Sequence, residues 1–163
     1  MSVSKLIQNI TRAPKGVLEI AFASAVSEEA TQPLKRICKN DCLAVEDVAR
    51  CLLLDLGNRS AIVRLRSLSV IDSLFMRSKA FRKSISVEIR SIAECAGFLN
   101  GKSFENTEHR DALQHRVKEL LEMWDTYYGE FHPEIRALSR HMREFLHLEM
   151  PNIEVTFLLM QIA

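Results

Sequence analysis

Hydrophobic positions recur three and four residues apart along most of the chain. This period is typical of helices buried on one face, whereas a half-buried strand alternates every second residue. Helices are predicted over residues 3–11, 33–39 (or from a Ser27 cap), 42–56, 60–77, 79–99 (as one or two helices), 103–128 or 107–128, and from 133 to before Pro151. Residues 155–162 fit a docked helix or a strand. The pattern predicts an all-α fold, either an up-down bundle or a right-handed superhelix of about seven to eight stacked helices.

The predicted helix over residues 60–77 is apolar around well more than half of its circumference. Its polar side chains gather on one narrow strip. A helix that is exposed to solvent only along such a strip must pack against other helices on both sides of the strip. We therefore expect it at the centre of the fold, with Leu68, Ile71 and Phe75 in the core. Arg64 points into the apolar arc, where an unpaired guanidinium would be costly. It should therefore reach an acidic partner or lie at a helix junction.

The length of 163 residues suits one domain, since chains average roughly 100–200 residues per domain. We predict a monomer with a single helical domain over residues 1–150 and a C-terminal tail over 151–163. Residues 13–33 combine Pro14, Gly16 and Pro33 with no consistent helical face, and are expected to be an insertion or a loop. No apolar run approaches the ~20 residues of a membrane span, so no membrane partner is expected.

The net charge of +1 conceals an excess of eight basic over two acidic side chains within residues 59–90. Such an excess can steer an acidic partner toward the middle of the domain. Arg59, Arg66 and Arg77 are 7 and 11 residues apart, close to whole helical turns, so they should align. Together with Arg82 they are the candidate partner-binding residues. The alternative is that these arginines bind no partner and form only a solvent-exposed ridge on the helix. Direct sequence-specific nucleic-acid binding is not expected, because a strongly basic face with interleaved aromatic residues is missing.

No residue pattern predicts catalysis, so no enzyme, no cofactor and no metal site is expected. The four cysteines are interpreted as buried thiols, because they form no CxxC pair and no zinc spacing with the histidines. The sequence GFLNGKS at residues 97–103 resembles a phosphate loop, but it is one residue short and lacks the strand that should precede it. Trp124 lies in an apolar stripe and is expected in the core.

Two motifs carry a resemblance to a known family. The first is LF-x-RS-x-x-FR, formed by Leu74, Phe75, Arg77, Ser78, Phe81 and Arg82, and it follows LKRICK at residues 34–39 and IVRLR at 62–66. The second is W-x-x-x-[FY]-G-E, formed by Trp124, Tyr128, Gly129 and Glu130. In this order, over residues 31–145, the chain resembles the N-terminal domain of the UV-stimulated scaffold protein A family, a relative of the VHS/ENTH superhelices.

The resemblance implies a right-handed VHS/ENTH-like superhelix and a nuclear, chromatin-associated, non-enzymatic scaffold of transcription-coupled nucleotide excision repair. The implied partners are stalled RNA polymerase II and the Cockayne syndrome proteins, and ubiquitin binding is also attributed to this domain type. Functions located in the family's C-terminal region are not carried over.

Two other functions remain open. One is a ubiquitin-binding VHS/ENTH adaptor in membrane trafficking, which is disfavoured because the single Trp lies late in the chain. The other is a reader of the phosphorylated polymerase tail, which would use a basic groove.

Overall fold

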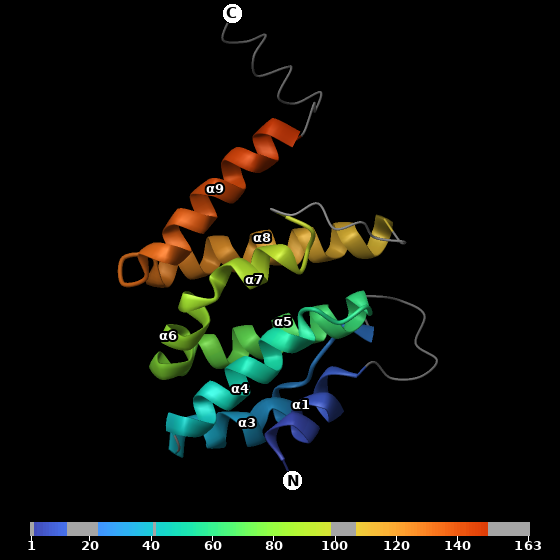
Figure 1. Cartoon of the computed structure of the whole chain (residues 1–163), viewed down its shortest axis with the longest axis vertical. Helices are drawn as coiled ribbons and strands as arrows, with labels where there is room; N and C mark the ends of the chain where they lie inside the picture. The colour runs from blue at the N-terminus through green and yellow to red at the C-terminus, as the bar shows by residue number, and fades with distance from the viewer. Residues whose placement is uncertain (1, 13–22, 41, 99–106, 150–163) are drawn as a thin grey trace, which may run out of the picture.

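The computed structural model describes residues 2–12, 23–40, 42–98 and 107–149. Over these ranges it contains α1 (Val3–Thr11), α3 (Glu28–Asn40), α4 (Cys42–Asp55), α5 (Ala61–Phe75), α6 (Lys79–Val87), α7 (Ile89–Glu94), α8 (Thr107–Tyr128) and α9 (Pro133–Glu149). There is no strand within the described ranges, so the all-α prediction is confirmed. The helices form an elongated stack, with α1 and α3 at one end and α9 at the other (Figure 1). None of the described helices is long and apolar enough to cross a membrane.

Serine side chains fix where several helices begin. Ser2, Ser60 and Ser78 each cap a helix, accepting a hydrogen bond from the backbone N–H three residues on, at 3.2, 3.3 and 3.2 Å. Such caps satisfy one of the N–H groups that the first helical turn leaves unpaired. The predicted starts of α1 and α5 therefore agree with the structure to within one residue.

The start of α3 corrects one expectation. Ser27 accepts a hydrogen bond from the backbone N–H of Ala30 at 3.2 Å, and the helix begins at Glu28, so Pro33 lies inside it. A proline removes one backbone hydrogen bond and usually disrupts a helix interior. Here the cap sets the start of the helix upstream of the proline. The expectation of an insertion or loop is thus wrong for residues 28–33, while residues 13–22 and the tail lie outside the described ranges.

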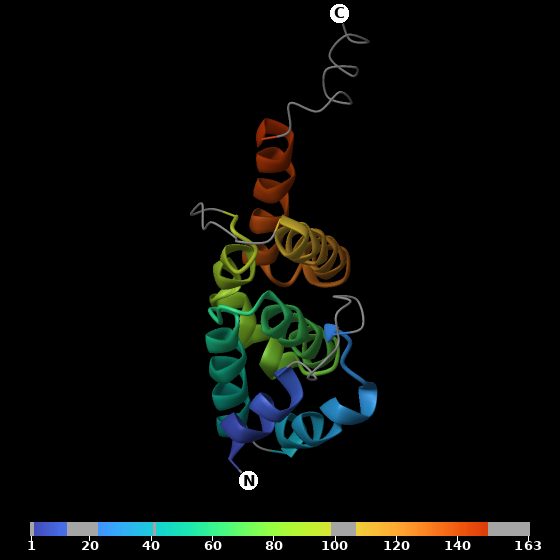
Figure 2. The same ribbon diagram turned by 90° about the vertical axis from the view of Figure 1, so that its right-hand side faces the viewer.

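Helix α5 lies at the centre of the stack, as predicted. It packs against α1, α3, α4, α6 and α8, and the turned view shows it enclosed by these neighbours (Figure 2). Leu68, Ile71 and Phe75 are completely buried. Because α5 contacts five other helices, the side chains that join it to them determine how the remaining helices are placed.

The predicted segment 79–99 forms two helices, which are separated at Glu88. After α7, Gly97 takes a φ of 82°, a left-handed conformation that favours glycine. The next residue, Phe98, is buried, and its N–H donates to the carbonyl oxygen of Ala93 at 3.2 Å. Gly97 therefore lets the chain turn after α7, and Phe98 fills the core. Residues 99–103 of the phosphate-loop-like sequence lie outside the described ranges.

We expect Leu68→Ala or Ile71→Ala to lower the free energy of unfolding by about 2–5 kcal/mol, because each change empties a fully buried position. Chemical denaturation measures the loss. Leu54→Ala is the matched control, since Leu54 is 72% exposed on α4 and should change stability by no more than about 0.5 kcal/mol. Equal effects at Leu68 and Leu54 would contradict the central position of α5.

Candidate functional site

The two family-like motifs meet in space at the contact between α5 and α8. The Phe75 and Trp124 rings stack with centroids 4.1 Å apart and planes 14° apart. Tyr128 meets Phe75 edge-on at 5.6 Å. Aromatic pairs in these geometries stabilise a core beyond the area that they bury. Residues about fifty positions apart in the sequence thus form one aromatic cluster, and Trp124 is completely buried in it.

Asp72 supplies the polar partner that this cluster needs. Its carboxylate accepts a hydrogen bond from the Trp124 indole N–H at 2.9 Å, and Arg116 Nη2 lies 3.6 Å from its other oxygen. A buried indole N–H without an acceptor would be costly. The Asp72 side chain is 20% exposed, so this carboxylate joins α5 to α8 without being fully removed from water.

Arg82 ties the first motif to the second. Its Nη1 donates to the carbonyl oxygen of Phe75 at 2.8 Å, and its guanidinium lies 4.2 Å from the centroid of the Tyr128 ring. A guanidinium over an aromatic face is attracted by the ring's quadrupole. The guanidinium of Arg82, one of the four candidate partner-binding residues, is thus engaged within the protein.

The corner between α8 and α9 depends on Asp125. Its carboxylate, 12% exposed, pairs with Arg136 at 3.0 Å and with Arg143 at 3.2 Å. Gly129 lies against this group: a Cβ there would stand 2.5 Å from the carbonyl oxygen of Asp125 and would also collide with its carboxylate. The glycine of the second motif is therefore required for space.

Gly129→Ala should lower the free energy of unfolding by about 1–3 kcal/mol, because the added methyl forces Asp125 away from Arg136. Thermal or chemical denaturation checks this. Gly57→Ala is a milder comparison, because its Cβ would stand 3.3 Å from a single carbonyl oxygen. A Gly129→Ala protein as stable as the Gly57→Ala protein would exclude this account of the motif glycine.

Arg66 does not lie on an open ridge. Its Nε and Nη2 donate to the carbonyl oxygen of Ile10 at 2.9 and 2.7 Å. Its Nη1 donates to the carbonyl oxygens of Ala23 and Ala25 at 3.0 and 2.6 Å. The arginine clamps α5 to the end of α1 and to the segment before α3, and burial lowers its pKa below the usual value, although an arginine stays charged at any physiological pH.

The prediction that Arg59, Arg66 and Arg77 align along one helix is also wrong, because the first and last of them lie outside α5. Arg59 precedes α5 and Arg77 follows it, so the three residues do not belong to one helix. Both side chains are exposed.

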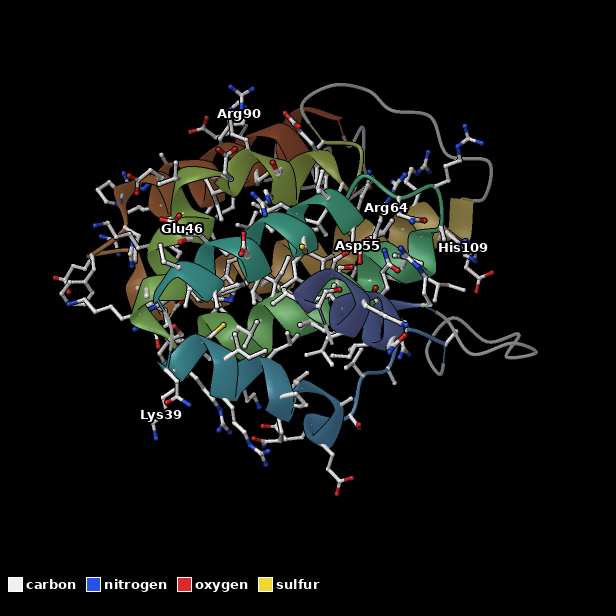
Figure 3. The ribbon with its side chains drawn as sticks, turned by 60° about the horizontal axis from the view of Figure 1, so that its bottom comes forward. Lys39, Glu46, Asp55, Arg64, Arg90 and His109 are labelled. Carbon is white, nitrogen blue, oxygen red and sulfur yellow. The ribbon has the colours of Figure 1, made fainter. Side chains whose placement is uncertain are left out.

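Arg64 lies at a helix junction, as predicted. It donates to the carbonyl oxygen of Asn58 at 2.5 Å and to that of Cys95 at 2.9 Å. It is labelled beside the start of α5 in Figure 3.

Arg66→Ala should lower the free energy of unfolding by about 2–4 kcal/mol, because it leaves the acceptors on α1 and on residues 23–25 without their charged donor. Equilibrium denaturation measures the loss. Arg59→Ala serves as the control and should stay within about 0.5 kcal/mol of wild type, since Arg59 is exposed. If Arg66→Ala leaves the free energy of unfolding unchanged, Arg66 does not clamp these segments, and the interpretation as a solvent-exposed ridge would be favoured.

Between α3 and the start of α6 lies a cleft of about 560 Å³, which we call the basic cleft. Of the residues that the structure describes, those lining it are Gln32, Lys35, Arg36, Cys38, Lys39, Leu74, Arg77, Ser78 and Lys79. Five of these are cationic and none is acidic. Of the sequence-predicted site residues only Arg77 belongs to it. The charge excess over residues 59–90 signalled Arg77 and Lys79. The lysines and arginine of α3 could be added only once α3 was known to lie beside them.

One carboxylate, that of Glu28, lies close to the basic cleft. It accepts a hydrogen bond from Lys35 and pairs with Arg77 at 3.1 Å. The hydrogen bond and charge of Lys35, with a smaller effect of Arg77, lower the pKa of Glu28 below its ordinary value. This edge of the cleft thus favours an ionised carboxylate.

The thiols near these sites show no sign of reactivity. Burial raises the pKa of Cys38 to about 11, so its thiol stays protonated at neutral pH and is a poor nucleophile. Cys95 is buried as well. In the part of the chain that the structure describes, His, Cys, Asp and Glu side chains form no group of three that could hold a metal ion.

Comparison with known proteins gives two matches. The family described as the UVSSA N-terminal domain matches residues 2–146. A UV-stimulated scaffold protein A homolog from Arabidopsis thaliana is 25% identical over 144 residues, which cover 85% of this chain and 22% of that protein. The chain therefore spans about a fifth of the length of the curated relative that it matches.

Proposed function

Because the chain belongs to the family of the UVSSA N-terminal domain, we propose that it is a non-enzymatic scaffold in transcription-coupled nucleotide excision repair. The family match over residues 2–146 carries this proposal. The proposed partners are the RNA polymerase II complex stalled at DNA damage and the Cockayne syndrome proteins, in the nucleus and on chromatin. Ubiquitin is a further proposed ligand. The Arabidopsis thaliana relative is named as a scaffold protein, which supports the same role for this chain.

The geometry of the motifs supports a scaffolding role over a catalytic one. The side chains of Phe75, Arg82 and Trp124 are engaged in packing and hydrogen bonds between helices. They join α5, α6 and α8, and they form no constellation of nucleophile, base and oxyanion donor at that point. Among the four arginines predicted to bind a partner, Arg59 and Arg77 keep exposed side chains. The proposal therefore retains these two as partner-facing residues.

Affinity purification of the tagged chain from UV-treated nuclei tests the proposal. We expect subunits of RNA polymerase II and repair proteins to be enriched over untreated nuclei, because a repair scaffold should meet the polymerase where damage stalls it. The Gly129→Ala protein is a control for folding, since it disturbs the α8–α9 corner and leaves the exposed Arg59 and Arg77 unchanged. Recovery of endosomal coat proteins in place of polymerase would favour the trafficking adaptor and overturn the proposal.

A further inference from the structure

We propose that the basic cleft between α3 and the start of α6 binds an acidic peptide segment of a partner protein. This inference rests on the proposed scaffold function, for which it supplies a docking site. The proposal commits to a peptide whose Asp and Glu side chains flank an apolar one. Four observations support this choice.

The first observation is uncompensated charge. Arg36, Lys39 and Lys79 are exposed, and none of them pairs with an acidic side chain in the described ranges. Figure 3 shows Lys39 projecting from the end of α3 into solvent. Cations gathered in a concave site raise the local concentration of an acidic ligand and speed its association.

A second groove in the same molecule provides a contrast. It is larger, about 750 Å³, and lies between α4, α6 and α7. Glu46 and Glu88 line it together with Arg50 and Lys83, so its charges balance. A groove between helices of this protein is therefore not positively charged as a rule. The excess of cations is specific to the basic cleft.

The second observation is the floor of the basic cleft. Leu74 and Cys38 line it and are 1% and 8% exposed. The volume of about 560 Å³ falls within the range of about 300–1,000 Å³ that ligand pockets occupy. An apolar floor under a cationic rim matches a peptide that inserts one aliphatic side chain between carboxylates.

The third observation is the spacing of the cations. Arg36 and Lys39 lie on α3, Arg77 on the turn after α5, and Lys79 at the first position of α6. A ligand with several separated negative charges can use all of them, whereas a single small anion cannot. The positive end of the α6 dipole, in a helix of nine residues, adds to the same field.

The fourth observation is the chemistry of the lining. The lining residues within the described ranges include no aromatic side chain, although single-stranded nucleic acids are usually held by bases that stack on aromatic rings. The carboxylate of Glu28 already pairs with Lys35 and Arg77 beside the cleft. The protein's own structure thus shows a carboxylate bound by two of the five cations.

A direct binding measurement on the purified protein tests the proposal. The probe is a fluorescein-labelled peptide of Asp and Glu with one central Leu, and fluorescence anisotropy at low salt reports its binding. Charge reversal by Arg36→Glu with Lys39→Glu should weaken binding by more than about tenfold, because two exposed, unpaired cations of the cleft are replaced by carboxylates. Arg36→Ala with Lys39→Ala should weaken it less, in the same direction, and remains informative if the reversal impairs folding.

The matched control is Lys118→Glu with Arg140→Glu. It changes the net charge by the same amount at two exposed positions, on α8 and α9 away from α3 (Figure 1). Binding by this control should stay within about twofold of wild type. An equal loss in both variants would mean attraction by net charge alone and would overturn the proposal.

Other occupants give distinct results. A peptide with Asn and Gln in place of the acids should not bind, and binding as tight as that of the acidic peptide would overturn the proposal. An oligothymidylate that bound more tightly than the acidic peptide would point to nucleic acid and overturn it as well. Self-association that is lost in the Arg36→Glu, Lys39→Glu protein would assign the cleft to a second copy of this chain. Because the assay uses neither nuclei nor polymerase, its failure leaves the proposed repair function to be decided by affinity purification.

Discussion

The burial of α5 is the constraint on which the rest of the structure depends. Five other helices pack against it, so each polar group that it buries must find a hydrogen-bond partner inside the stack. Arg66 meets this requirement with carbonyl oxygens of Ile10, Ala23 and Ala25. Asp72 meets it with the indole of Trp124. These two side chains determine how α1 and α8 are attached to the central helix.

The same constraint explains why motif residues are poor guides to a docking surface in this domain. Residues such as Trp124 and Arg82 resemble the family at the positions where α5, α6 and α8 meet. Their chemistry is engaged there in stacking and hydrogen bonding. Side chains that can meet a partner lie elsewhere, at the basic cleft, where the exposed Arg36, Lys39 and Lys79 form no ion pair with a described acidic side chain.

Most of the helical layout could be predicted from periodicity and capping, because these depend on residues close together in the sequence. The extent of α1 follows from its apolar spacing and from Pro14 after it, and the central place of α5 follows from the spread of apolar residues around that helix. The start of α3 was ambiguous, because a Ser27 cap competes with Pro33. The role of Arg66 could not be predicted, since its acceptors are backbone carbonyls 41 to 56 residues away. The basic cleft could not be predicted either, because it forms only where α3 lies beside the turn between α5 and α6.

A double-mutant cycle on Asp72 and Trp124 tests most directly whether α5 and α8 are joined through the motif. Asp72→Ala removes the acceptor, and Trp124→Phe removes the indole N–H while keeping a ring against Phe75. If the hydrogen bond joins the helices as described, the two changes should be coupled by about 1 kcal/mol or more in the free energy of unfolding. Effects that add to within about 0.3 kcal/mol would contradict the account.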